Sequence, residues 1–406
     1  MTTMIDPPKA DGFRISQLLY DTRYRSITIQ VIAFIAFMLV AAFLVVNVNT
    51  NLAKLGKEIN FGFLQNPANY DIQQHLVDYS SQSSNLQAAW VGLINTLFVA
   101  FLGCILATLI GVTAGVLRLS KNWLVAKIMT VYVETFRNIP VVIWIIATMA
   151  VLSEALPQPK AFRGENPDAS MWLWDSVAVT GRGTYIPRPE WGAGSVFVVL
   201  TFLLSLVGIW AFGKWAMRRF QATGQILPTF WIKLAIFVVP TLLVFFIMGR
   251  PITLISPELK GFNFKGGIQL SNSFLALWLA LSVYTGSFIA EIVRSGILAI
   301  SKGQSEAAFA LGMRPSRTMN LVILPQALRV IIPPLISQFL NLTKNSSLAL
   351  AVGYQDLRAT LGGTTMNNTG RELECMLLMM MIYLVVSLLI SSGMNVYNKS
   401  MKLKER

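Results

Sequence analysis

Cysteine and histidine are scarce in this chain. Its 406 residues include two cysteines and a single histidine, His75. Cys104 lies inside an apolar run and Cys375 at the edge of another, so they predict neither a disulfide framework nor a metal site. With one histidine, the sequence does not suggest a histidine-based metal centre or a serine–histidine–aspartate triad. We therefore expect no catalytic residue, no metal site and no cofactor on this chain.

Charged residues are also few. They make up 13% of the chain against 54% hydrophobic residues, a balance that is atypical of a water-soluble protein of this size. A membrane-spanning helix needs about 20 apolar residues. The sequence has eight runs of sufficient length, at 26–48, 89–117, 128–152, 194–217, 230–249, 273–298, 330–352 and 375–397. The predicted fold class is all-α, a polytopic membrane helical bundle.

The net charge of +14 is distributed unequally between the two sides of the membrane once the eight apolar runs are taken as spans. With both termini placed in the cytoplasm, 19 of the 33 lysines and arginines fall on the inner side, together with only five acids. That side then carries essentially the whole excess of positive charge. The positive-inside rule explains this pattern, so no nucleic-acid partner is expected.

A short polar segment separates the sixth and seventh apolar runs. It reads GQSEAAFALG from Gly303 to Gly312. Glu306 suits a helix start, with its carboxylate near the positive end of the helix, and Gly312 allows the chain to turn. Pro325 is expected to make the following helix begin afresh. The pattern predicts a small helix-turn-helix that protrudes between two spans.

This segment and its surroundings resemble the permease subunits of ATP-binding-cassette importers. In that family the corresponding loop, the EAA loop, docks into a cleft on the ATPase. The resemblance extends to YVETFRNIP from Tyr132, YTGSFIAEIVRSG from Tyr284, LPQALRVIIPP from Leu324 and KNSSLALAVG from Lys344. These stretches look like the polar amino acid uptake branch, typified by histidine, glutamine and arginine importers. Asn138 and Ser295 depart from that pattern, where glycine is usual, as does Ser346, where threonine is usual.

The resemblance covers about 89–152 and 273–397 and implies a division of the chain. The family core, of the type I importer kind, has five spans, so three are additional here and resemble those of the larger general L-amino acid permeases. The expected segments are a cytoplasmic segment 1–25, an extra span and periplasmic loop 26–88, core spans 89–152, an inserted loop and span pair 153–272, core spans 273–397 with a coupling loop 301–325, and a basic cytoplasmic tail 398–406.

The same resemblance implies a function and a set of partners. The chain is expected to be a permease subunit in the bacterial inner membrane, surrounded by membrane lipids, that passes L-amino acids delivered by a periplasmic binding protein. A second permease, a homologous but distinct chain, would complete the path. A dimer of separate ATPases would bind ATP and Mg, so this chain is not itself an enzyme. The implied ATPase contacts are Gly303, Gln304, Glu306, Ala307, Ala308, Gly312, Leu324 and Pro325.

Ionisable and polar residues inside the spans share helical faces. Their spacings of three and four residues place them on one side of each helix, and charges in hydrocarbon are expected to pair or to line a wet cavity. Two interpretations remain open: ion pairs that fix the packing, including neutralisation of Glu134 or Glu291 by Lys344, or a substrate path. The candidate path residues are Glu134, Arg137, Tyr284, Ser287, Glu291, Arg294, Asn341, Lys344 and Asn345.

Prolines and glycines predict where the spans break or touch. Pro140 is expected to interrupt the third span, and Pro325, Pro333 and Pro334 the start of the seventh, since proline lacks the amide donor. Gly111 and Gly115 form a GxxxG pattern that permits close contact of the second span with a neighbour.

The alternative function is a stand-alone ion- or proton-coupled secondary transporter or channel. It would explain Glu134, Glu291 and Lys344 as a relay. It would not explain the polar helix-turn-helix segment.

Overall fold

The computed structural model describes residues 22–54, 56, 59–164, 167–225 and 227–401. Within them, eight helices are long and apolar enough to cross a membrane, which confirms the predicted all-α bundle of eight spans. The chain forms two compact units, Met1–Leu64 and Gln65–Arg406. The first contains helix α2 (Thr22–Lys54), whose apolar side chains are exposed along its length. Most of the predicted cytoplasmic ends, 1–21 and 402–406, lies outside the described residues.

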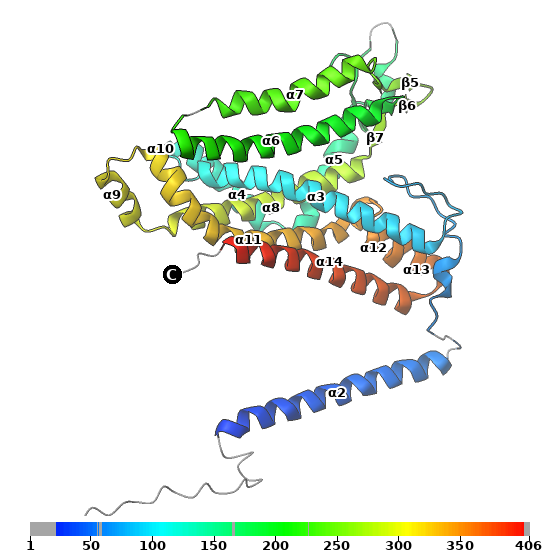
Figure 1. Cartoon of the computed structure of the whole chain (residues 1–406). Helices are drawn as coiled ribbons and strands as arrows, with labels where there is room; N and C mark the ends of the chain where they lie inside the picture. Colours follow the sequence, from blue (N-terminus) through cyan, green and yellow to red (C-terminus); the bar gives the residue numbers. More distant parts are fainter. Residues whose placement is uncertain (1–21, 55, 57–58, 165–166, 226, 402–406) are drawn as a thin grey trace, which may run out of the picture. The chain divides into compact units, whose positions relative to one another are not determined.

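Helix α8 (Asn272–Leu298) is the central element of the second unit (Figure 1). It packs against α3 (Asn85–Leu117), α4 (Trp123–Asn138), α5 (Val141–Glu154) and α11 (Leu324–Asn345). Its buried residues include Leu277, Leu281 and Ile289, all fully enclosed. Because α8 has neighbours on several sides, it fixes the relative positions of the other core helices.

The GxxxG pattern lies in the contact between α3 and α8. A Cβ atom at Gly111 would lie 2.5 Å from the Cβ of Ile289, and one at Gly115 would lie 2.6 Å from the carbonyl oxygen of Ala290. Real side chains do not tolerate such distances, so the two helices cross at glycine surfaces. The predicted close contact is confirmed.

The third apolar run forms two helices rather than one. Helix α4 ends at Asn138, Ile139 is extended with φ −106° and ψ 133°, and Pro140 caps α5. A residue that precedes proline avoids the helical region, which explains the break. The predicted interruption at Pro140 is confirmed. The bounds differ from the predicted run 128–152, since the stretch long and apolar enough to cross a membrane is Val141–Phe162, which includes the short helix η2 (Pro159–Phe162).

The polar segment forms the predicted helix-turn-helix. Helix α9 (Lys302–Ala310) is followed by Gly312, with φ +71°, and by α10 (Pro315–Thr318). That φ value lies in the left-handed region that glycine adopts without strain. The helix begins earlier than expected, so Glu306 lies beyond the first turn, where no acidic residue is found. The expected favourable placement of its carboxylate at the helix start is therefore wrong.

The prolines of the seventh span do not break it. Residues 315–352 form one helical run, in which the π-helix η3 (Met319–Ile323) leads directly into α11. Leu324 donates its amide hydrogen to the Met319 carbonyl, five residues back, and this wider turn accommodates the ring of Pro325. Pro333 and Pro334 lie inside the helix. The expected fresh start at Pro325 and breaks at Pro333 and Pro334 are wrong.

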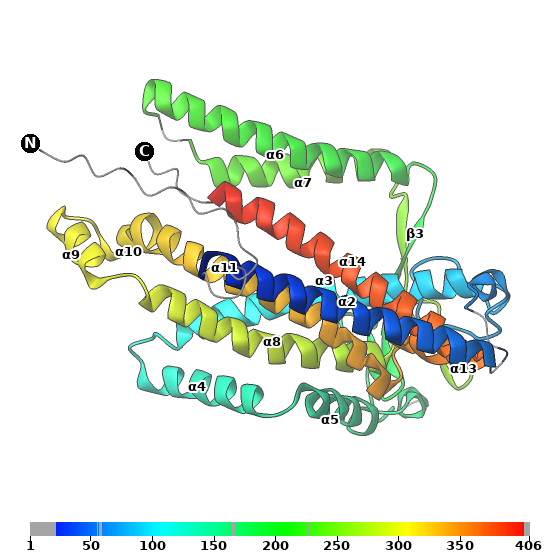
Figure 2. The same ribbon diagram turned by 90° about the horizontal axis from the view of Figure 1, so that it is seen from below.

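The inserted block carries small β-sheets that the sequence patterns did not predict. Their strands frame a helical hairpin of α6 (Ser195–Thr223) and α7 (Thr229–Ile247). Strand β3 (Arg188–Trp191; Figure 2) leads into α6, β4 (Ile252–Ile255) follows α7, and their antiparallel pairing closes the base of the hairpin. The ladders are β1 (Ala178–Thr180), β2 (Gly183–Ile186) and β7 (Ile268–Leu270); β3 (Arg188–Trp191) and β4 (Ile252–Ile255); and β5 (Glu258–Lys260) and β6 (Asn263–Lys265).

Polar contacts tie the opposite end of the bundle, away from α9, to the loop before α3. Asn95 donates to the carbonyls of Gln74 at 2.8 Å and Gln355 at 2.9 Å. Asp356 is fully buried and accepts from the Ala359 amide at 2.9 Å. Burial raises the pKa of the Asp356 carboxyl to about 6. The short helix η1 (Gly62–Gln65) precedes the loop in the sequence. This end contains η4 (Ser346–Val352), α12 (Leu357–Ala359), η5 (Thr360–Thr365), α13 (Met366–Thr369) and the start of α14 (Glu372–Met401).

The close contact between α3 and α8 predicts that one methyl group added at Gly115 lowers the stability of the fold. Replacing Gly115→Ala should destabilise the fold by about 1–3 kcal/mol, because the added carbon meets the α8 backbone. Thermal unfolding of the detergent-solubilised protein measures the effect. The matched control is Gly393→Ala in α14, where no atom lies within 4 Å of the added carbon. Equal unfolding temperatures for the two variants would contradict the close helix crossing.

Candidate functional site

Helix α9 and the turn after it present an exposed surface at one end of the bundle, which we call the coupling surface (Figure 2). Of the eight residues predicted to contact an ATPase, seven are exposed: Gly303, Gln304, Glu306, Ala307, Gly312, Leu324 and Pro325. Ala308 is only 4% exposed and packs toward the protein. Ala308 therefore anchors α9 and is not available for a partner, unlike its predicted neighbours.

Two large apolar side chains on the coupling surface were missed by the sequence analysis. Leu311 is 81% exposed and Phe309 is 55% exposed. Both flank the turn at Gly312, and the Met313 amide donates to the Ala308 carbonyl at 3.1 Å across that turn. Gln326 at the start of α11 donates to Gln304 at 3.3 Å. The surface is thus a small, braced knob with an apolar tip, which suits insertion into a cleft of another protein.

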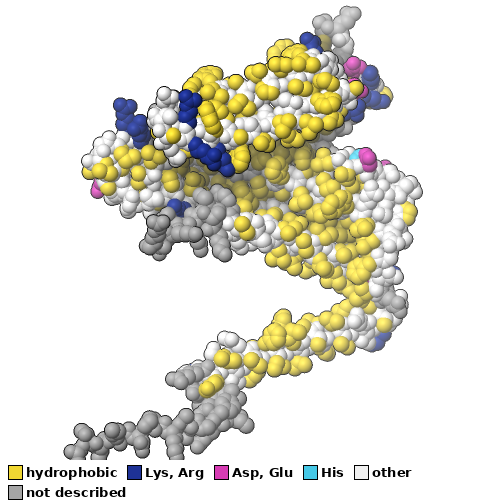
Figure 3. Space-filling model, in the orientation of Figure 1, with side chains coloured by type: hydrophobic (Ala, Val, Ile, Leu, Met, Phe, Trp, Pro, Cys, Tyr) yellow, Lys and Arg dark blue, Asp and Glu magenta, His cyan; other side chains and the backbone are white. Residues whose placement is uncertain are grey.

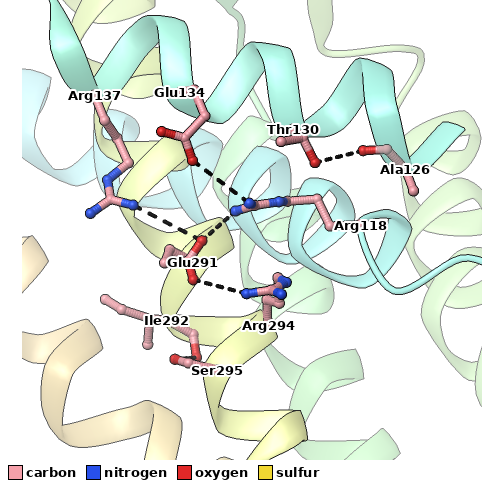
Figure 4. Close-up of polar contacts among 9 residues, drawn as sticks. All are labelled: Arg118, Ala126, Thr130, Glu134, Arg137, Glu291, Ile292, Arg294 and Ser295. Carbon is pink, nitrogen blue, oxygen red and sulfur yellow. Dashed lines mark hydrogen bonds and ion pairs between the residues drawn. The ribbon is translucent and has the colours of Figure 1, made fainter. Parts of the chain in front are cut away.

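A charged cluster joins three core helices near the same end of the bundle (Figure 4). Glu291 of α8 pairs with Arg118 at the end of α3, with Arg294 at 3.2 Å and with Arg137 of α4 at 4.0 Å. Arg118 also lies 3.9 Å from Glu134 of α4. Charges within the spans were expected either to pair or to line a wet cavity, and Glu291 and Arg294 do form a pair.

Arg118 is the member of the cluster that the sequence analysis missed. Its side chain is 7% exposed, although its position after an apolar run placed it among the inner loop cations. One feature of the sequence could have indicated its burial: Arg118 lies three residues after Gly115, where α3 must approach another helix closely. Glu134 is 56% exposed, so it lies at the edge of the cluster, whereas Glu291 lies at its centre.

The remaining path candidates do not join this cluster. Asn341 and Lys344 are exposed on α11, and no ion pair recorded within the described ranges involves Lys344. The expected neutralisation of Glu134 or Glu291 by Lys344 is therefore wrong. Asn345 and Tyr284 are half-buried, while Ser287 is fully buried and donates to the Tyr284 carbonyl at 2.6 Å. The nine candidates divide into an internal cluster, an exposed face of α11 and a packed segment of α8.

A cavity of about 690 Å³ lies between α3, α11 and α14, and none of the nine candidates lines it. Its lining is apolar and includes Phe101, Phe339 and Ile390. Among the residues that the structure describes, no group of three or more potential ligands could hold a metal ion. The described residues thus form an exposed helix-turn-helix surface and a charged cluster that joins three helices.

Comparison with known proteins adds three findings. The model of the family described as "Binding-protein-dependent transport system inner membrane component" matches residues 205–403. The glutamate/glutamine/aspartate/asparagine transport system permease protein BztB of Rhodobacter capsulatus is 54% identical, over 100% of both chains. The general L-amino acid transport system permease protein AapQ of Rhizobium johnstonii is 43% identical, over 98% of both chains.

The charged cluster predicts unequal effects of removing its two acids. Glu291→Gln should destabilise the protein by on the order of 3 kcal/mol, because three arginines lose their shared partner and Arg118 is buried. The matched control Glu134→Gln should cost less than about 1 kcal/mol, since its ion pair is long and the Glu134 side chain is exposed. Unfolding of the two variants in the same detergent compares them. A larger loss for Glu134→Gln would contradict the central place of Glu291.

Proposed function

Because this chain belongs to the family of binding-protein-dependent transport system inner membrane components, we propose that it forms one half of the path of an ATP-driven L-amino acid importer. The full-length identity of 54% to an amino acid permease carries this proposal. It is a membrane transport subunit, and importers of this family work with an ATPase and a binding protein.

The coupling surface is our candidate for the ATPase contact. Glu306 and Gly303 are exposed on α9, and the apolar side chains of Phe309 and Leu311 project at the turn. Apolar residues at the centre of a small polar knob are typical of protein interfaces. In this proposal two ATPase subunits bind ATP and Mg and each receives one such knob.

The proposed orientation places the coupling surface and both chain termini in the cytoplasm. The distribution of lysine and arginine along the sequence favours this orientation, and the fold is consistent with the same orientation. Lys121 lies in the turn between α3 and α4, and Lys302 begins α9. The start of α4 and α9 lie at the same end of the bundle (Figure 2), and positive charge is favoured on the cytoplasmic side. The loop before α3 and the small sheets then face the periplasm, where a binding protein delivers the solute.

A second permease is proposed to complete the path. Asn341 and Lys344 are exposed on α11 of the isolated chain, although they lie within an apolar span. A lysine that faces lipid at this depth would cost several kcal/mol, so a polar surface of a partner or a water-filled path is the more favourable neighbour. A homologous but distinct chain that packs against this face would enclose a path between the two subunits.

The proposed substrate contacts follow from amino acid chemistry. Every free amino acid carries a carboxylate, for which Lys344 and Asn341 are suitable donors, and an ammonium group, which an acidic side chain of either permease could accept. The relatives carry the names of glutamate, glutamine, aspartate and asparagine transport and of general L-amino acid transport. We propose L-amino acids as the class that is carried.

Conformational coupling in this proposal runs from α9 to α8. Helix α8 ends at Leu298 and α9 begins at Lys302, so only three residues separate the two helices. The charged cluster fastens α8 to α3 and α4 near that junction. A displacement of the knob on ATP binding would therefore move several core helices together. The stand-alone secondary transporter is the less favoured alternative, since both relatives are subunits of transport systems.

Docking through the coupling surface predicts a specific loss of function. Glu306→Lys and Gly312→Pro should each abolish co-purification of the ATPase and ATP-driven uptake, because one reverses a charge on the knob and the other removes the turn's conformation. Membrane insertion should remain intact. Affinity purification and uptake in vesicles measure the effects, with the charge reversal Lys121→Glu as the control at the same end of the bundle. Normal uptake by Glu306→Lys would refute the docking assignment.

A further inference from the structure

The α6–α7 hairpin carries positive charge without any acid to balance it. Between Ser195 and Ile247 the sequence contains Lys214, Arg218, Arg219 and Lys233 and no aspartate or glutamate. None of these four cations belongs to an ion pair among the described residues. They occupy the end of the hairpin where α6 passes into α7, and Figure 3 shows dark-blue side chains gathered there beside a broad yellow apolar surface.

A cavity of about 370 Å³ lies between the two helices at this end. Its lining includes Gly213, Phe220 and Lys233. A Cβ atom at Gly213 would lie 3.4 Å from the Lys233 ammonium nitrogen, so the lysine side chain crosses the hairpin where glycine leaves room. The half-buried ammonium therefore lies beside the cavity.

Neighbouring contacts hold further cations at the same place. The Arg219 guanidinium donates to Gln225, which also lines the cavity, at 3.2 Å, and lies 5.4 Å from the centre of the Trp215 ring. Lys214 lies 3.8 Å from the centre of the Trp210 ring. Tryptophan favours the level of the lipid headgroups, so these rings mark the membrane interface at the cationic end of the hairpin.

We propose that this end of the hairpin binds the phosphodiester headgroup of an anionic phospholipid. Lys233 and Arg219 supply the positive charge, and the cavity accepts the headgroup. The acyl chains lie along the exposed apolar side chains of Phe220, Phe230 and Trp231, which a soluble ligand would leave uncovered. Basic pockets between membrane helices are suited to anionic lipids because charge attraction and apolar burial act on one molecule.

This site goes beyond the transport function and gives the inserted helices a role. The hairpin packs chiefly on itself, and its own strands β3 and β4 close its base. A lipid held between α6 and α7 would fix their separation at the end where no ladder joins them. Free phosphate shares the phosphodiester's charge but lacks acyl chains, so the two sources can be distinguished.

The test uses native mass spectrometry of the purified importer complex, delipidated and titrated with phosphatidylglycerol. Phosphatidylcholine with the same acyl chains and inorganic phosphate are the comparison ligands. The double variant Lys233→Gln/Arg219→Gln should weaken phosphatidylglycerol binding by about 25-fold, at about five-fold per charge removed. The control double variant Lys121→Gln/Lys127→Gln removes equal charge from exposed positions at the same end of the bundle and should leave binding unchanged.

A third variant separates the cavity from the charge. Gly213→Leu fills the space beside Lys233 without altering any charge, and it should lower phosphatidylglycerol binding while leaving membrane orientation unchanged. Equal binding of the two phospholipids, an equal loss in the control variant, or displacement of phosphatidylglycerol by millimolar phosphate would each overturn the proposal. Because binding is measured without transport, a failure here leaves the proposed importer function untouched.

Discussion

The close crossing of α3 and α8 is the constraint on which the rest of the core depends. Gly111 and Gly115 allow the two helices to touch at backbone distance, opposite Ile289 and Ala290. Arg118 follows Gly115 by one turn and Glu291 follows Ala290 directly, so the same crossing brings their charges together. Apolar packing and the charged cluster are thus two consequences of one helix contact.

The cluster is unusual in that one carboxylate serves three arginines. Glu291 contacts guanidinium groups from α3, α4 and its own helix. Because Arg118 is buried, removing the shared acid would leave its charge without its nearest partner, which favours a single arrangement of the three helices. The coupling surface follows α8 in sequence, so in the proposed function this joint would pass movement of α9 to the other core helices.

The sequence predicted the features that depend on local patterns. Eight apolar runs of sufficient length identified the spans, and Gly312 between short helical segments identified the helix-turn-helix. The strands escaped prediction because each has only three or four residues, and two of the four pairings, β2 with β7 and β3 with β4, join segments on either side of the inserted helices. Pro333 and Pro334 were misjudged because tolerance of proline in a membrane helix depends on its neighbours.

The candidate site was predicted only where local sequence patterns determine it. Residues of α9 share one short segment, so their exposure followed from the helix-turn-helix, except for Ala308, whose burial depends on the position of α9 against the bundle. Glu291 and Arg294 are three residues apart on one helix and were paired correctly. Arg118 and Lys344 were misjudged, because their surroundings are set by tertiary contacts between helices.

The most direct measurement is thiol labelling at the tip of the coupling surface, in a Leu311→Cys variant whose Cys104 and Cys375 are replaced by alanine. Leu311 is the most exposed apolar side chain of that surface. A membrane-impermeant maleimide should label it in inside-out vesicles stripped of the ATPase and fail to label it in intact cells, and adding the ATPase should protect it. Labelling from outside intact cells would contradict the account.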